Sequence, residues 1–217
     1  VFPQATLQGQ CWEFAAPDQS ARLFWTQEYP GRYWANFGPF PVIADMDNDG
    51  REDIVLTGKP AYVAVIDADL GAIKFDLKYT IPGEDGVGRP YGLIQAVDLD
   101  GDGFRDVVVA SCQVEEYIAV LHNDSGKALE LAWSHFVEHD HPEDVRELRP
   151  QIASIADLEG DGRKEIVLGL FNEQQDGRWR TVVLDALAGW NARKHQILDR
   201  YFWGCYDLDG DGAPELI

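Results

Sequence analysis

A nine-residue pattern of acidic residues and glycine occurs four times in this 217-residue chain and constrains its fold more than any other feature. The copies begin at Asp45, Asp98, Asp157 and Asp207, so successive copies are 53, 59 and 50 residues apart. Positions 1, 3, 5 and 9 of every copy are acidic, and position 6 is always glycine. Self-similarity at such a period is typical of a repeat architecture in which each repeat is one structural unit.

The spacing of the acids predicts a cation site in each loop. Carboxylates at alternate positions of a tight loop can converge on one point, and their mutual repulsion then favours a bound cation. Glycine at position 6 supplies a backbone conformation that a bulkier residue resists. Calcium takes roughly six to eight oxygen ligands, whereas magnesium demands stricter geometry, so this many carboxylates favour calcium.

The predicted ligands of up to four calcium ions are the acids at positions 1, 3, 5 and 9 and the backbone carbonyl of position 7. These are Asp45, Asp47, Asp49, Arg51 and Asp53 in the first loop; Asp98, Asp100, Asp102, Phe104 and Asp106 in the second; Asp157, Glu159, Asp161, Arg163 and Glu165 in the third; and Asp207, Asp209, Asp211, Ala213 and Glu215 in the fourth.

Two other structures can carry acid-and-glycine sequences. A solvated turn between two strands fits many isolated Asp-Gly sequences, although four matched copies disfavour it. An EF-hand requires a bidentate glutamate at position 12, where the first three copies have Leu56, Val109 and Leu168. The segments that follow the acids, such as 53–58 and 106–111, are short and β-branched, which predicts strands. The loops are therefore expected to join strand to strand.

The period also predicts the architecture. Each repeat contains about four strand-like stretches, which is typical of a β-propeller blade, so we expect an all-β propeller of four-stranded blades in one domain, 1–217. The predicted blades are 35–83, 84–142 and 143–200, with 1–34 as the last strands and 201–217 as the first strands of a blade. Joined, these two ends would close a four-bladed ring. The alternative, which the sequence favours, is a segment of a larger propeller of the seven-bladed type.

The loops resemble those of the FG-GAP/VCBS repeat family. The resemblance covers roughly residues 35–217 and rests on the DxDxDGxxD/E loops that begin at 45, 98, 157 and 207. It implies a calcium-loop β-propeller, as in integrin α-chains and in many secreted bacterial proteins, lectins and polysaccharide-active enzymes, with the metal loop between the first and second strands of each blade. It does not imply one activity, because a fold hosts many functions.

The charge of the chain limits the classes of partner. The formal net charge is −20, from 38 acidic and 18 basic residues, which disfavours nucleic acid and anionic membranes because binding them requires Lys and Arg. No apolar run reaches the roughly 18 residues of a membrane span, so no membrane insertion is expected. Extracellular calcium modules bind at about 0.1 to 1 mM calcium. We therefore expect an extracellular, cell-surface or periplasmic location.

The connections between the predicted blades are rich in aromatic residues and arginine and form a second candidate site. Planar guanidinium groups beside aromatic rings suit a ligand with sugar rings and carboxylate or sulfate groups, such as an acidic glycan. The alternative is that the arginines pair with carboxylates of neighbouring blades while the aromatic rings pack between blades. The predicted ligand-binding residues are Arg32, Tyr33, Trp34, Arg89, Tyr91, Arg149, Arg200 and Trp203.

Three functions remain open from the sequence. The leading hypothesis is a calcium-stabilised binding or adhesion module, without catalysis, for a glycan or a protein. A carbohydrate-active enzyme such as a polysaccharide lyase would need a basic group that removes a sugar-ring proton; the candidates are Lys59, Lys194, His139, His141 and His195. The third hypothesis is a structural assembly subunit whose incomplete end blade is completed by a neighbouring chain.

Two further groups of residues have open interpretations. His135, Glu138, Asp140 and their neighbours in the segment 135–144 could hold a transition metal or supply an acid/base pair, or form a solvated loop. The chain has three cysteines, at 11, 112 and 205, which permit at most one internal disulfide and a free thiol.

Overall fold

The computed structural model describes residues 7–15, 20–29, 41–58, 61–80, 92–111, 117–136, 148–172 and 178–217. Within these ranges the strands form three four-stranded sheets and two two-stranded sheets, and neighbouring strands run antiparallel. The helical content of these ranges is one 3-10 turn, η2 (Trp190–Ala192). No helix in this part of the chain is long and apolar enough to cross a membrane.

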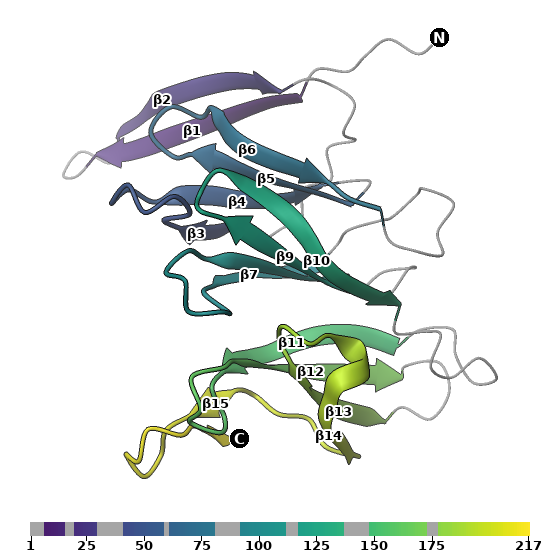
Figure 1. The fold of residues 1–217 in the computed structure, drawn as a ribbon. Helices are drawn as coiled ribbons and strands as arrows, with labels where there is room; N and C mark the ends of the chain where they lie inside the picture. The colour runs from purple at the N-terminus through teal and green to yellow at the C-terminus, as the bar shows by residue number, and fades with distance from the viewer. Residues whose placement is uncertain are drawn as a thin grey trace, which may run out of the picture.

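The sheets follow one another in sequence order. The N-terminal pair is β1 (Leu7–Ala15) and β2 (Ser20–Tyr29); the first blade is β3 (Val42–Ala44), β4 (Asp53–Gly58), β5 (Tyr62–Asp67) and β6 (Ile73–Lys78); the second blade is β7 (Gly92–Val97), β8 (Asp106–Ser111), β9 (Tyr117–Asp124) and β10 (Ala128–Phe136); the third blade is β11 (Leu148–Ala156), β12 (Glu165–Asn172), β13 (Trp179–Asp185) and β14 (Arg193–Leu198); the C-terminal pair is β15 (Cys205–Tyr206) and β16 (Glu215–Leu216). Figure 1 shows them stacked face to face in a row.

The predicted propeller fold is confirmed. Each blade is a four-stranded antiparallel meander, and each acidic loop joins the first strand of its sheet to the second. The less favoured alternative, a closed four-bladed ring, is not formed in this structure, because the N-terminal and C-terminal pairs are separate sheets at opposite ends of the row (Figure 1). Cys11 in β1 and Cys205 in β15 are accordingly free thiols, and Cys112 lies outside the described residues.

The central strands pack on both faces. Along β8, Val107 and Val109 face the first blade, whereas Val108 and Ala110 face the third. All four side chains are fully buried. Because successive side chains of a strand point to opposite faces of its sheet, a strand between two other sheets needs an apolar residue at every position. This requirement accounts for the unbroken apolar run that follows the second acidic loop.

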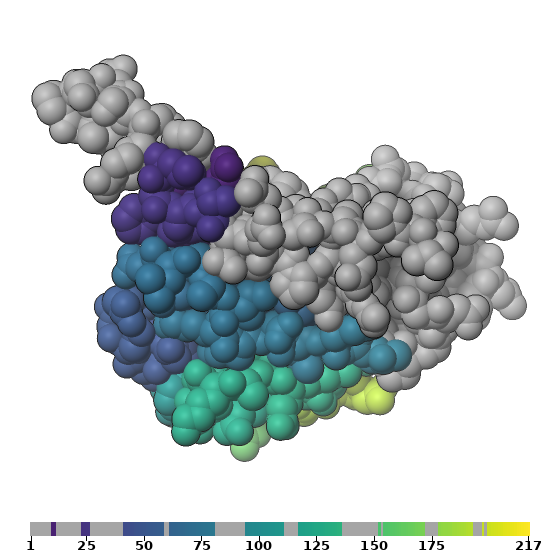
Figure 2. Space-filling model, turned by 90° about the horizontal axis from the view of Figure 1, so that it is seen from above, coloured from purple at the N-terminus to yellow at the C-terminus, as the bar shows by residue number. Residues whose placement is uncertain are grey.

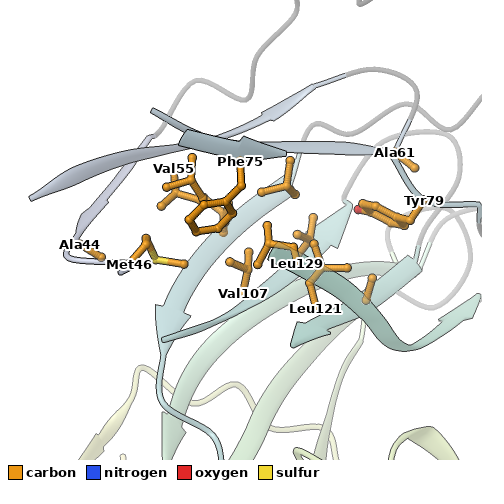
Figure 3. Close-up of a cluster of buried hydrophobic side chains, with 14 of the residues drawn as sticks. Ala44, Met46, Val55, Ala61, Phe75, Tyr79, Val107, Leu121 and Leu129 are labelled. Atoms are coloured by element: carbon orange, nitrogen blue, oxygen red, sulfur yellow. The ribbon is translucent and has the colours of Figure 1, made fainter. Parts of the chain in front are cut away.

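The core between the first and second blades is shown in Figure 3. Val55 and Phe75 of the first blade point toward Val107, Leu121 and Leu129 of the second blade. Phe75 is 9% exposed and Leu129 4%, and the other three are fully buried. Burial of a Val, Leu or Phe side chain stabilises a fold by about 1.5 to 3 kcal/mol, so this interface contributes a large part of the stability of the row.

Two tryptophans connect neighbouring sheets by the same contact. Trp25 Nε1 in β2 donates a hydrogen bond to the Ala68 carbonyl after β5, and Trp133 Nε1 in β10 donates to the Ala186 carbonyl after β13, each at 2.8 Å. Figure 2 shows the described residues of β2 lying against the first blade. The turn glycine beside Trp25, Gly71, has no room for a side chain, because a Cβ would lie 2.5 Å from the indole ring.

The substitution Trp133→Phe tests this contact, because it removes the indole N–H and keeps an aromatic ring. The Ala186 carbonyl then loses its partner at a partly buried position, so the free energy of unfolding should fall by about 1 to 2 kcal/mol. Urea unfolding at fixed calcium measures the loss. Trp203→Phe, at a residue 77% exposed, is the control and should stay within about 0.5 kcal/mol of the parent. Equal losses in both variants would contradict a role for the indole bond.

Candidate metal centre

The four acidic loops share one position in their sheets. Each begins directly after a first strand and ends at the start of a second strand, over residues 45–53, 98–106, 157–165 and 207–215. The first and second loops touch, since Asn48 Nδ2 of the first loop donates a hydrogen bond of 2.9 Å to the Gly103 carbonyl of the second. The loops therefore gather on one face of the row.

Three hydrogen bonds recur in all four loops. The position 1 acid accepts from the position 6 glycine N–H at 2.7 to 3.1 Å. The position 5 acid accepts from the position 7 N–H at 2.7 to 2.9 Å. The position 9 acid accepts from the position 2 N–H at 2.8 to 3.2 Å. The carboxylates thus shape the loop that carries them, while the metal-ligand role of the position 7 carbonyl stays a prediction.

Two positions of each loop adopt a left-handed backbone. The position 6 glycines have φ between +83° and +93°, which explains why glycine is invariant there. Position 4 is also left-handed, with φ from +58° to +82°, and is occupied by Asn48 in the first loop and by glycine in the others. Position 4 was not among the positions that the acidic pattern singled out, although glycine and asparagine are the residues that tolerate this conformation.

Side-chain ligand atoms within 4.8 Å of one another occur in three of the loops. The groups are Asp45, Asp47 and Asp53; Asp98, Asp100 and Asp102; Asp100, Asp106 and His122; and Asp207, Asp209 and Glu215. Among the described residues the third loop contributes no such group. Its acids at positions 3 and 9 are Glu159 and Glu165, whose side chains are one methylene longer than the aspartates of the first two loops.

These distances fit a hard divalent cation. Oxygen ligands lie roughly 2.3 to 2.6 Å from calcium, so two ligands on opposite sides of the ion are about 5 Å apart. The 4.8 Å limit of each group meets that requirement. In the first loop, Asp47 Oδ1 is buried and accepts no hydrogen bond from the described residues, which is costly for a carboxylate oxygen without a cation.

The position 9 acids are the most deeply buried acids of the first three loops. Asp53 is 1% exposed, Asp106 2% and Glu165 0%. Burial raises the pKa of Asp53 and of Asp106 above the usual range, although a hydrogen bond from Lys74 to Asp53 and backbone N–H donors to Asp106 work in the opposite direction. At position 1 of the third loop, which is partly buried, the hydrogen bond from the Gly162 N–H lowers the pKa of Asp157.

Two side chains outside the nine-residue pattern enter these clusters. Lys74 Nζ of β6 lies 2.9 Å from Asp47 Oδ2 and 2.9 Å from Asp53 Oδ1. His122 Nδ1 of β9 lies 3.0 Å from Asp106 Oδ1. The pattern itself gives no signal for either residue, because both reach the loop from later strands of the same blade.

The buried Asn123 connects the second blade to the first loop. Its Nδ2 donates hydrogen bonds to the Met46 carbonyl at 2.8 Å and to the Arg105 carbonyl at 3.0 Å, and its Oδ1 accepts from the Gly126 N–H at 3.1 Å. Asn123 is 0% exposed. The first loop is therefore supported by the turn of its neighbour as well as by its own blade.

Only some of the predicted ligand-binding residues lie within the described ranges. Arg32, Tyr33, Trp34, Arg89 and Tyr91 lie outside the described residues, and Arg149 is placed as a backbone position in β11.

Arg200 and Trp203 lie between β14 and β15, and both are exposed. Trp203 contacts Tyr201 edge-on, with ring centroids 5.5 Å apart, and Tyr201 packs on Trp179 at 4.3 Å. This stretch therefore combines an exposed guanidinium group with a row of aromatic rings.

The histidine-rich segment is divided between a strand and the undescribed residues. His135 lies in β10, and its ring stacks on Trp190 of η2 with centroids 4.3 Å apart and planes 12° apart. His135 therefore packs between the second and third blades. Residues 137–144 of the segment, including His139 and His141, lie outside the described residues.

Comparison with known proteins gives sequence and fold relatives. The sequence model of an FG-GAP-like repeat matches residues 45–109 and 98–168. Integrin alpha-4 of Xenopus laevis is 24% identical over 167 residues, which cover 69% of this chain and 16% of the integrin. The crystal structure of Saccharomyces cerevisiae Sqt1 is similar in fold, with a TM-score of 0.59 and 12% identity over 91% of this chain and 47% of that one. This chain thus corresponds to less than half of either protein.

Proposed function

This chain belongs to the FG-GAP-like repeat family, and from that premise we propose that it is a calcium-stabilised binding module that acts outside the cytosol. One observation carries the proposal. In the first, second and fourth loops, acidic ligand atoms gather within 4.8 Å of one another, while recurring backbone hydrogen bonds hold the loops in shape. Such a concentration of carboxylates is stabilised when a divalent cation balances the charge.

Calcium is the cation that suits these loops best. Each loop offers several carboxylate oxygens and a flexible, glycine-containing backbone, whereas magnesium requires near-octahedral geometry and retains water. The acids at positions 1, 3, 5 and 9 would hold the ion, which ties the start of the second strand to the end of the first. Up to four ions can bind, and the third loop, with its two glutamates, should differ most in affinity.

The location and the partner follow from the calcium requirement and the relatives. Calcium modules of this class bind at about 0.1 to 1 mM, a concentration that occurs outside the cytosol. Similarity to an integrin α-chain supports a protein partner, and the exposed Arg200 and Trp203 support an acidic glycan as the alternative. The separate end pairs support a segment of a larger propeller. The lyase alternative rests on side chains outside those described, so the binding module is the better-supported function.

A binding panel tests this function. The chain is immobilised and exposed to neutral, uronic-acid and sulfated polysaccharides and to purified extracellular-matrix proteins, in millimolar calcium and in chelator, while unsaturated sugar products are monitored. Saturable, calcium-dependent binding without product is expected, and Trp203→Ala should weaken glycan binding more than Tyr206→Ala, a nearby exposed aromatic control. Release of unsaturated sugar, or binding that is unchanged in chelator, would contradict the proposal.

A further inference from the structure

The first acidic loop contains a positive charge supplied by the chain itself. Lys74 Nζ lies 2.9 Å from Asp47 Oδ2, 2.9 Å from Asp53 Oδ1 and 3.3 Å from Asp49 Oδ2. These three acids occupy positions 3, 5 and 9 of the loop. The Lys74 side chain is 15% exposed, so most of it is enclosed by the loop and its own sheet. One ammonium group therefore contacts three of the four carboxylates that the proposed function assigns to a calcium ion.

The backbone of β6 places Lys74 in this position. β5 and β6 are paired at Val65 with Phe75 and at Ile66 with Ile73, so Lys74 is the extra residue of a β-bulge. A bulge redirects the side chain of its extra residue relative to the regular pleat. The lysine is thus held at the loop by the register of the sheet and not by an incidental surface contact.

The other blades provide an internal comparison. The bulge in β10 places Ala132 at the same register position of the second blade, between Leu131 and Trp133. An alanine supplies no charge there, and the second loop instead contacts His122, a residue of β9. In the third blade the same register position is occupied by Lys194. The first and third blades therefore have a lysine at this register position, and the second blade has an alanine.

We propose that Lys74 is the resident counter-cation of the first loop, so that the charge of this loop is partly neutralised without metal and the loop binds calcium more weakly than the second and fourth loops. An ammonium group has three donors and no acceptor, which suits three surrounding carboxylates. Because like charges repel, calcium can enter the loop only when Lys74 is displaced. The comparison of calcium affinities rests on the proposed function, whereas the partial neutralisation of the metal-free loop by Lys74 does not.

The test uses Lys74→Met, which removes the charge and retains an apolar side chain of similar length. Lys78→Met is the matched control, because it makes the same change of net charge at an exposed position of the same strand. Calcium binding is measured by equilibrium dialysis and by competition with a chromophoric chelator, starting from calcium-loaded protein. The calcium affinity of one site should rise by about tenfold or more in Lys74→Met, since the ammonium group that competes with calcium for three carboxylates is removed. That gain should be lost in Lys74→Met combined with Asp47→Asn.

A second measurement separates this inference from the proposed function. In chelator, Lys74→Met should melt at a lower temperature than Lys78→Met, because the carboxylates of the first loop then repel one another without the ammonium group between them. Absence of calcium binding in every variant would refute the proposed function, while the melting comparison would still test Lys74. Identical melting of the two variants in chelator would overturn the inference, as would a gained calcium site that survives Asp47→Asn. If Lys74→Met folds in calcium but does not fold in chelator, that result would support the inference.

Discussion

Removal of calcium is expected to lower the melting temperature of this chain substantially. If each site binds at about 0.1 to 1 mM, a filled site adds roughly 0.4 to 1.4 kcal/mol at 1 mM calcium. Three independent sites, one in each of the first, second and fourth loops, then contribute about 1 to 4 kcal/mol. Each kcal/mol shifts the melting temperature of a chain of this size by roughly 2 to 4 °C. Calorimetry in calcium, in chelator and after calcium is restored measures the shift.

The controls for calcium removal separate specific binding from ionic strength. Magnesium at the same concentration should restore little of the lost stability, because it binds poorly to sites built for more ligands. Asp209→Asn removes a carboxylate of the fourth loop. It should reduce the fall in melting temperature on calcium removal by the contribution of one site. If equilibrium dialysis shows that chelator has emptied the loops and the melting temperature has not moved, calcium has no structural role here.

Gly126→Ala is expected to cause the largest loss of stability among the substitutions considered. Gly126 has φ of +71°, and a Cβ there would lie 2.6 Å from the Asp47 Cα and 3.1 Å from the Phe104 ring. The left-handed backbone costs an alanine about 1 to 2 kcal/mol, and the overlap with the backbone of the first loop adds about 1 to 3 kcal/mol. Urea unfolding in calcium should show a total loss of about 2 to 5 kcal/mol.

Gly160→Ala is the matched control for this substitution. Gly160 has φ of +69°, and a Cβ there would meet no atom within 4 Å. It therefore carries the same backbone strain without the overlap, and its loss should be about 1 to 2 kcal/mol. If the two alanine variants lose the same free energy, the approach of the second blade to the first loop does not determine stability.

The repeated loop made the fold predictable from the sequence. Its position between two strands follows from the β-branched segments that succeed it, and the confirmed meander of each blade follows from the roughly 50-residue period. The unbroken apolar run of β8 also indicates a strand that is buried on both faces. Only a strand enclosed by two neighbouring sheets needs apolar residues at Val107, Val108, Val109 and Ala110 together.

The surroundings of the loops could not be predicted in the same way. Lys74 reaches the first loop through a bulge in β6, and Asn123 reaches it from the adjacent blade. Both contacts depend on the register between strands that are distant in sequence, which a nine-residue pattern does not encode. The separation of the N-terminal and C-terminal pairs likewise depends on how the blades stack, and the sequence left closure into a ring as an open alternative.

The two-sided burial of the blades has a consequence for how such a protein changes in length. The second blade contacts the first blade and the third blade through two separate cores, each of which is formed by residues of both partners. Stability is then approximately a sum over neighbouring pairs, as in other repeat proteins. Duplication or loss of one blade changes that sum by one contact and leaves the remaining contacts as they were, so selection can alter the number of blades without redesigning any of them.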